Sequence, residues 1–178
     1  MNKNRCKWVS DDEVYIQYHD QEWGIPTHDD RELFEMLVLE SFQAGLSWIT
    51  ILKKRKNFKK AFDDFDVEKV ACYDDFKVEE LLSNEGIIRH KGKITSAINN
   101  AKVFIEIQKE FGSFDEYIWG FTSGEIIKAE YLTESDLSKR ISKDLKKRGM
   151  RFVGPTIIYS YLESIGIIDN HEENCFKF

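Results

Sequence analysis

The sequence has few prolines and cysteines and no long hydrophobic run. Its 178 residues include 2 prolines and 3 cysteines, and its hydrophobic runs, such as residues 36–39, are only a few residues long. A membrane-spanning helix needs roughly 20 apolar residues, so no membrane span is expected. The first six residues lack the apolar stretch of a secretory signal, so we expect a cytoplasmic protein with reduced thiols. Three cysteines cannot all pair, which excludes a complete disulfide framework.

Length and composition indicate one folded globular unit. Hydrophobic residues make up 42% of the chain and charged residues 33%. This balance excludes the disordered and collagen-like classes. Since single domains usually span about 100–200 residues, one domain is expected.

Helical patterns cover the chain and predict an all-α fold. Ser10, with Glu13 three residues later, has the spacing of a capping box and predicts the start of a short helix. A long helix is predicted at 91–111, and no segment alternates for long enough to indicate a strand. Residues 122–134 are expected to form a loop. Further helix starts are predicted at Asp29, Ser47, Asp66, Asp74 and Ser113.

Residues 135–166 have the pattern of a helix, a short hairpin and a second helix. The first helix should end at Gly149, and Pro155 is suited to be the first residue of the next helix. Glycines permit a positive φ, and free N–H groups at a helix start can bind phosphate. The alternative is an ordinary pair of helices, but this would not explain the basic residues around the turn.

The basic residues are unevenly distributed along an acidic chain. The net charge is −6, yet the runs 53–60, 89–93 and 139–151 hold six, three and seven of the 26 lysines and arginines. Such runs are usually solvated helix faces. Because the densest run flanks the hairpin, we instead predict contacts with a phosphate backbone.

Glu40 follows Leu37 by three residues and Leu33 by seven, which places it on the inward face of its helix. Burying a carboxylate costs several kcal/mol unless it is paired, so Glu40 either belongs to an ion pair or lines a polar cavity. Flat rings near a carboxylate suit a planar cationic base, although aromatic stripes are more often plain core. The aromatic residues nearest in sequence are Trp8, Tyr15, Tyr18, Trp23 and Trp48.

Cysteine and histidine occur together at both ends of the chain. Cys6 and His19 lie near the start, and His171 and Cys175 are spaced by four residues near the end. Two thiolates and two imidazoles make a tetrahedral zinc set, which here would join the two ends. The alternative is that the two pairs are unrelated. Cys72 remains as a buried thiol.

Four segments, in order along nearly the whole chain, resemble the bacterial DNA-3-methyladenine glycosylase I family. They are YIQYHDQEWGIP (15–26), LFEMLVLESFQAGLSWITILKKR (33–55), GIIRHKGKI (86–94) and RFVGPTIIYSYLESIGIIDNH (151–171). The resemblance implies a helix-hairpin-helix base-excision glycosylase in which one structural zinc joins the N- and C-terminal segments. It also implies that Cys6, His19, His171 and Cys175 are the zinc ligands.

The resemblance assigns roles to pocket and hairpin residues. It implies that Glu40 is the catalytic residue that contacts the damaged base, that Trp48 stacks on the base and that Tyr18 helps to hold it. Trp8 and Trp23 match other pocket positions. DNA contacts are expected in the hairpin region, at Gly149, Arg151, Val153, Gly154 and Thr156. Thr156 lies where lyase-competent relatives carry a lysine, so the resemblance implies a monofunctional enzyme.

The expected activity is hydrolysis of the N-glycosidic bond of 3-methyladenine, flipped out of duplex DNA. Asp169 is an alternative candidate for the group that orients water. We expect a monomer without an obligate protein partner, in which 1–178 is one glycosylase unit, 29–165 its helical body, and 1–28 with 166–178 a zinc-binding lobe. The rival hypotheses are a non-catalytic helix-hairpin-helix DNA-binding protein and an acidic helical protein-interaction module.

Overall fold

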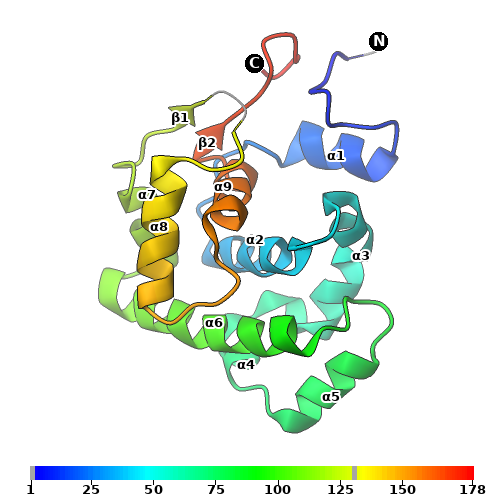
Figure 1. The fold of residues 1–178 in the computed structure, drawn as a ribbon, viewed down its shortest axis with the longest axis vertical. Helices are drawn as coiled ribbons and strands as arrows, with labels where there is room; N and C mark the ends of the chain where they lie inside the picture. The colour runs from blue at the N-terminus through cyan, green and yellow to red at the C-terminus, as the bar shows by residue number, and fades with distance from the viewer. Residues whose placement is uncertain (1–2, 130–131) are drawn as a thin grey trace.

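The computed structural model describes residues 3–129 and 132–178, which fold mainly into helices, as predicted (Figure 1). The helices are α1 (Glu13–Gln21), α2 (Asp30–Gln43), α3 (Trp48–Ala61), α4 (Val67–Ala71), α5 (Asp75–Ser83), α6 (Lys91–Phe111), α7 (Phe114–Gly120), α8 (Asp136–Lys147) and α9 (Pro155–Ser164). A short helical turn, η1 (Asp63–Phe65), and two short strands, β1 (Ile127–Lys128) and β2 (Ile168–Asp169), complete the described elements.

Most helices begin where the capping residues predict. Four predicted side chains accept hydrogen bonds from N–H groups in the first turns of α2, α4, α5 and α7; they belong to Asp29, Asp66, Asp74 and Ser113. Such caps satisfy N–H groups that have no partner inside the helix. Ser47 also precedes α3 as predicted, but its hydroxyl lies 2.7 Å from Thr50 Oγ1 and makes no cap to the backbone.

The predicted start of the first helix is wrong. Helix α1 begins at Glu13, and its N-cap is Asp12, not Ser10; Asp12 Oδ1 accepts a hydrogen bond from Val14 N at 3.0 Å. Asp12 also pairs with Lys53 Nζ of α3 at 2.6 Å. Because this ion pair joins two helices, the local spacing around Ser10 could not reveal it.

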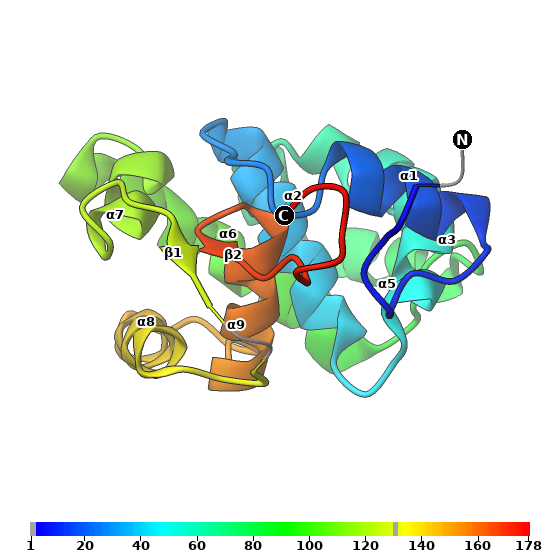
Figure 2. The same cartoon turned by 90° about the horizontal axis from the view of Figure 1, so that it is seen from above.

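Helix α2 lies in the middle of the molecule in both views (Figures 1 and 2). It packs against α3, α6, α7 and α9. All residues from 33 to 42 are buried, so the polar side chains among them lie inside the protein. Two of these are glutamates, Glu35 and Glu40, a residue type that is rarely buried without a partner.

The segment after α8 forms the predicted hairpin. Helix α8 ends at Lys147, Gly149 has a φ of +100°, and Pro155 is the first residue of α9, which packs against α8. Phe152, at the turn, also has a positive φ of 55°, which is uncommon for a bulky residue. The helix, hairpin and helix therefore follow one another as the glycines and proline predict.

Polar side chains from three helices hold the backbone of the hairpin. The donors to its carbonyl oxygens are Ser41 of α2, Asn99 and Asn100 of α6 and Ser142 of α8. Ser41 directly follows Glu40 in the chain, and its hydroxyl lies 3.1 Å from Phe152 O and 2.8 Å from Leu37 O, so one proton is shared between these two carbonyl oxygens. The hairpin is thereby joined to the turn of α2 that carries Glu40.

The sequence pattern predicted no strands, and this prediction is wrong in one place. Strands β1 and β2 pair in parallel, with Ile127 opposite Ile168 and Lys128 opposite Asp169. A pairing of two residues on each strand is too short to give an alternating pattern, and it depends on contacts distant in sequence. The loop predicted at 122–134 therefore contains β1, and its residues 130 and 131 lie outside the described part of the chain.

The N- and C-terminal segments lie side by side (Figures 1 and 2). Phe176 N donates to Asn4 O at 2.8 Å, and Lys7 N donates to Glu172 Oε1 at 2.8 Å. The two ends of the chain are thus close enough to share one site.

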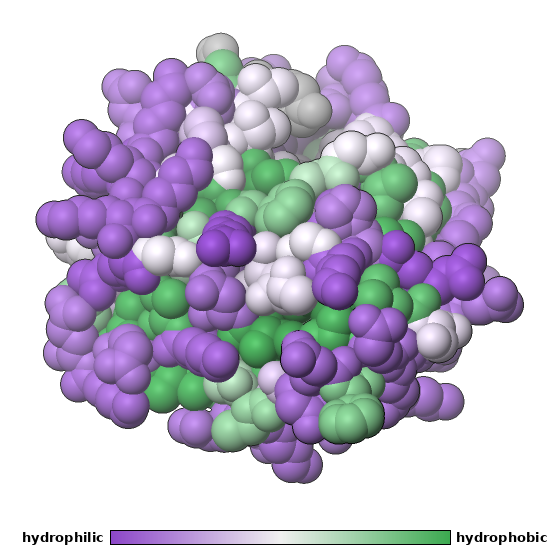
Figure 3. All heavy atoms as spheres, turned by 60° about the horizontal axis from the view of Figure 1, so that its bottom comes forward, coloured by the Kyte–Doolittle hydropathy of each residue, from purple (hydrophilic) through white to green (hydrophobic). Residues whose placement is uncertain are grey.

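The surface seen in Figure 3 is largely polar, with hydrophobic patches between hydrophilic side chains. A mixed surface of this kind is ordinary for folded proteins. Among the described residues, no helix is both long and apolar enough to cross a membrane.

Candidate functional site

A cavity of about 200 Å³ lies between α1, α2, α3, α9 and the N-terminal segment. This is smaller than the roughly 300–1,000 Å³ of pockets for drug-sized ligands, so it suits one small molecule. No lysine or arginine is among the described residues that line it. The lining consists of Trp8, Tyr15, Tyr18, Trp23, Glu40, Gln43, Trp48, Ser160 and Glu163.

Glu40 lies on the α2 wall of this cavity with only 4% of its surface exposed. Its carboxyl group forms no hydrogen bond or ion pair with any described residue, and it is not sealed from the cavity. Burial, and then the negative charge of Glu163, raise the pKa of Glu40 well above its usual range. The carboxyl group is therefore available to a ligand.

Aromatic rings form most of the remaining wall. The ring centroids of Tyr18 and Trp48 are 5.5 Å apart, and those of Trp8 and Trp23 are 5.0 Å apart in an edge-to-face arrangement. The hydroxyl of Tyr15 accepts a hydrogen bond from Ile49 N at 3.1 Å, which joins α1 to the start of α3. A flat ligand in the cavity would meet π-faces and one or more carboxyl groups.

The structure brings together six residues named from the sequence: Trp8, Tyr15, Tyr18, Trp23, Glu40 and Trp48. It adds three that the sequence analysis did not single out. Gln43 and Ser160 are ordinary polar residues with no local signal, but Glu163 is an acid among the apolar residues of α9. The reasoning that selected Glu40 would have selected Glu163 as well.

Glu163 is 8% exposed, and its Oε1 accepts a hydrogen bond from Asn170 Nδ2 at 2.6 Å. Burial raises the pKa of Glu163 to about 7. The cavity therefore has two carboxyl groups, on α2 and α9, and both are harder to ionise than an exposed glutamate.

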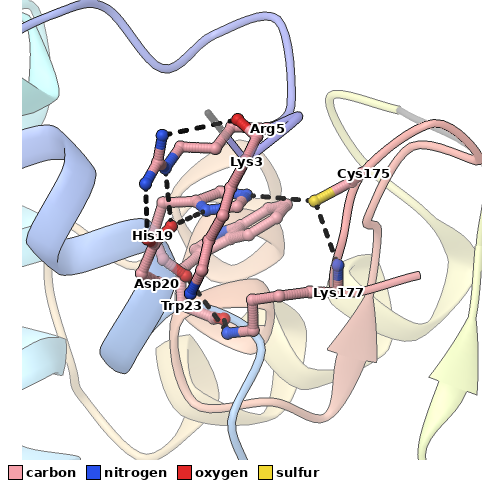
Figure 4. Close-up of polar contacts among 7 residues, drawn as sticks. All are labelled: Lys3, Arg5, His19, Asp20, Trp23, Cys175 and Lys177. Carbon is pink, nitrogen blue, oxygen red and sulfur yellow. Dashed lines mark hydrogen bonds and ion pairs between the residues drawn. The ribbon is translucent and has the colours of Figure 1, made fainter. Parts of the chain in front are cut away.

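A second cluster joins the chain ends. The metal-binding atoms of Cys6, His19 and Cys175 all lie within 4.8 Å of one another, and all three residues are buried. His19 Nε2 is 3.5 Å from Cys175 Sγ (Figure 4). In a tetrahedral zinc site with Zn–N and Zn–S bonds of about 2.1 and 2.3 Å, these two atoms would be roughly 3.5 Å apart. The cluster thus has the donor types and spacing that zinc prefers.

The fourth candidate ligand, His171, lies beside this group and not within it. Its ring centroid is 5.4 Å from that of His19, and its buried Nε2 has no hydrogen-bond partner among the described residues. The Nδ1 atoms of His19 and His171 lie 2.9 and 2.7 Å from carboxylate oxygens of Asp20 and Asp169. Carboxylates commonly orient zinc-bound histidines in this way and leave Nε2 for the metal.

One expectation from the sequence fails at these sites. Cys72 is exposed, so it is not the buried thiol that we expected; the buried cysteines are Cys6 and Cys175. Asp169 is not among the described residues that line the cavity, and its Oδ1 lies 2.7 Å from His171 Nδ1.

The hairpin presents some of its predicted DNA-contact residues and buries one side chain. Arg151 and Thr156 are exposed, as is Gly149, and Gly154 is half-buried. The side chain of Val153 is fully buried, so only its backbone could reach a ligand there. Val153 O is already occupied by the hydroxyl of Ser142 at 2.6 Å.

The three basic runs differ in how free their charges are. Lys93 is buried, and its Nζ donates to Phe42 O and Ala44 O at 2.8 and 2.6 Å, so its expected place in a basic patch is wrong. Several bases in the first run pair with acids, Arg55 and Lys59 among them. In the run that leads into the hairpin, five basic residues have no ion pair to a described residue: Arg140, Lys143, Lys146, Lys147 and Arg151. Of these, Arg140 donates to Phe121 O at 2.8 Å.

Comparisons with known proteins cover almost the whole chain. The family described as methyladenine glycosylase matches residues 8–178. DNA-3-methyladenine glycosylase 1 of Escherichia coli (strain K12) is 45% identical over 177 residues, which are 96% of this chain and 95% of that protein.

Solved structures give the same picture. A crystal structure of 3-methyladenine DNA glycosylase I has a TM-score of 0.94 and 45% identity, covering 97% of this chain and 98% of that one. A tyrosine-to-phenylalanine variant of 3-methyladenine DNA glycosylase I, in complex with 3-methyladenine, has a TM-score of 0.93 and 37% identity, covering 97% of this chain and 96% of that one.

Proposed function

The chain belongs to the methyladenine glycosylase family, and on this premise we propose that it is a base-excision repair enzyme that hydrolyses the N-glycosidic bond of 3-methyladenine in alkylated DNA. The observation that carries the proposal is Glu40, a buried carboxyl group without a counter-charge on the wall of an aromatic cavity.

The chemistry of the lesion fits this cavity. Adenine methylated at N3 carries a positive charge, so its bond to deoxyribose is weakened and it can leave as a neutral base. Little acid catalysis is needed, and the main task is to select the cation. The rings of Tyr18 and Trp48 can stack on it. Glu40 can accept a hydrogen bond from its amino group, and the positive charge of the base stabilises the ionised carboxylate that burial disfavours.

A base inside a duplex cannot reach such a cavity, so the nucleotide must be flipped out of the stack. Two features suit contacts with the phosphate backbone. They are the N–H groups at the start of α9 and four basic side chains without an ion pair, those of Lys143, Lys146, Lys147 and Arg151. This helix-hairpin-helix interface would bind duplex DNA. Ser41 connects the hairpin to the turn of Glu40, which fixes the pocket relative to the bound strand.

A monofunctional reaction belongs to the same proposal, because Thr156 at the start of α9 offers no amine for a Schiff base. Water then attacks the sugar, and the methylated base leaves. We also propose that the enzyme acts as a monomer in the cytoplasm, where the buried thiols of Cys6 and Cys175 stay reduced.

We infer that Cys6, His19, His171 and Cys175 hold one structural zinc ion. Support comes from the clustered donors, the orphaned Nε2 of His171 and the carboxylates behind both imidazoles. When bound, zinc would cross-link the N- and C-terminal segments and lie outside the reaction. The rings of His19 and Trp23 are stacked at 5.8 Å, so the cross-link would also support one wall of the cavity.

The zinc proposal predicts that Cys175→Ser loses the metal and that its melting temperature falls by roughly 10 °C, since a structural metal contributes folding free energy. Elemental analysis and thermal unfolding measure the two effects. Cys72→Ser, which removes an exposed thiol, is the matched control and should retain about one zinc per chain. Equal zinc in Cys175→Ser and the unmodified protein would remove Cys175 from the site.

The activity is tested by incubating the purified protein with methylated duplex DNA and identifying the released bases by mass spectrometry. We expect 3-methyladenine. Salt-sensitive duplex binding without base release would instead favour a non-catalytic DNA-binding protein. Loss of both release and binding would favour a protein-interaction module.

A further inference from the structure

The cavity contains a second carboxyl group whose presence the aromatic pocket and Glu40 do not explain. Glu163 of α9 and Glu40 of α2 line the same small space, and each has less than a tenth of its surface exposed. The charge of Glu163 raises the cost of ionising Glu40, and no lysine or arginine among the described lining residues offsets it. Two acids in this arrangement destabilise the empty pocket.

One oxygen of Glu163 is occupied and the other is free. Oε1 accepts the 2.6 Å hydrogen bond from Asn170 Nδ2, which fixes the side chain. Oε2 has no hydrogen-bond partner among the described residues and is not sealed from the cavity. The carboxyl group is thus held from one side and open to a ligand on the other.

A purely structural role does not require an acid at this position. Glutamine has the same shape, and its carbonyl oxygen would accept the Asn170 hydrogen bond without placing a second ionisable acid beside Glu40. A carboxyl group is useful here only if something positively charged enters the cavity.

We propose that Glu163 is a second substrate-facing carboxyl group that, together with Glu40, makes the pocket selective for a cationic purine over a neutral one. This inference rests on the proposed function. A cationic base between α2 and α9 would offset the cost of ionising the two acids, whereas a neutral base of the same shape would leave that cost in place. Glu163 is therefore a specificity-determining residue, and its effect appears in the comparison of charged and neutral ligands.

The test compares two ligands that differ by one methyl group and one charge, the fixed cation 3,9-dimethyladeninium and neutral 9-methyladenine. Three of the four tryptophans line the cavity, so quenching of their fluorescence reports binding. In Glu163→Gln the preference for the cation should fall by about tenfold at pH 8, where the second acid is largely ionised. Binding of 9-methyladenine should not weaken.

Glu35→Gln is the matched control, because Glu35 is an equally buried acid that lies outside the cavity. Its ligand preference should stay within about twofold of the unmodified protein. Glu163→Asp keeps the charge but withdraws it from the cavity, and we expect a partial loss of preference. This variant also supplies the test if Glu163→Gln fails to fold.

An unchanged preference in a folded Glu163→Gln, or an equal fall in Glu35→Gln, would overturn the inference. The outcome is separable from failure of the proposed function. If the unmodified protein releases 3-methyladenine and prefers the cation, but Glu163→Gln does so equally, only the role of Glu163 is refuted. If the unmodified protein does neither, the proposed function itself fails.

Discussion

Helix α2 buries two glutamates, five residues apart, in opposite surroundings. Glu35 is 3% exposed, and its oxygens lie 2.7 Å from Arg55 Nε and 3.7 Å from Lys59 Nζ. Glu40 is 4% exposed, yet the charged group that acts on its pKa is another acid, Glu163, in the same cavity. The first glutamate belongs to an ion-pair network between α2 and α3, and the second faces an aromatic cavity.

This difference shows that burial alone does not mark a functional acid. Both glutamates are buried in α2, and ion pairing accounts for Glu35. The distinguishing feature of Glu40 is the missing counter-charge, together with access to a space where a ligand can supply one. A cationic substrate fills the role for Glu40 that Arg55 fills for Glu35.

The largest expected effect comes from removing the partner of Glu35. In Arg55→Met, Glu35 keeps only the more distant Lys59, so the free energy of unfolding should fall by about 3 kcal/mol at pH 7. Urea denaturation measures the loss. Lys56→Met, on the same helix but exposed, should change stability by less than about 0.5 kcal/mol. Equal losses of unfolding free energy in Arg55→Met and Lys56→Met would contradict the view that Glu35 depends on Arg55 as its counter-charge.

Replacing Glu163 should produce a pH-dependent gain in stability. Glu163, which lies near Glu40 of α2 and Tyr18 of α1, has a pKa of about 7 in the folded protein, against about 4.5 for an ordinary glutamate. The unfolded chain therefore loses this proton first, and the native state is destabilised as pH rises from about 4.5 to 7. Relative to the unmodified protein, Glu163→Gln should gain up to about 3 kcal/mol between pH 4.5 and 8.

Unfolding in urea at a series of pH values measures this gain, with Glu35→Gln as the reference for an acid that already has its counter-charge. A constant difference between Glu163→Gln and the unmodified protein would contradict the description of Glu163 as an acid that resists ionisation.

The smallest expected effect concerns exposed charges, in contrast to the buried, paired Glu35 and the buried acids of the cavity. Lys146 and Lys147 on α8 are exposed and without ion pairs to described residues. In the double alanine variant, duplex affinity should fall several-fold, and the slope of log affinity against log salt should decrease by about 2. Replacement of Lys109, which pairs with Glu106, is the control and should leave the slope unchanged. An unchanged slope in the double variant would exclude α8 from the interface.

The sequence predicted the features that depend on neighbours along the chain. The caps at Asp29 and Ser113, the long helix α6 and the hairpin before Pro155 all follow from local rules. The inward position of Glu40 follows from the 3.6-residue period in the same way.

Features that depend on contacts distant in sequence were not predictable. Asp12, the N-cap of α1, also pairs with Lys53 of α3, and the short strands exist only through their mutual pairing. Lys93 belongs to a basic run but is buried because it binds two carbonyl oxygens at the end of α2. The sequence shows that Glu163 is an acid on an apolar helix. Its position in the same cavity as Glu40 depends on the packing of α9 against α2, which the local pattern does not give.

The most direct test of the account is the rate of 3-methyladenine release from methylated duplex DNA, at saturating enzyme, for Glu40→Gln and Glu35→Gln. Losing the charged acceptor should slow release by about 100-fold in Glu40→Gln without a comparable loss of duplex binding. Glu35→Gln, corrected for its folded fraction, should release the base within about twofold of the normal rate. Release at the normal rate by Glu40→Gln, or equal slowing in both variants, would contradict the account.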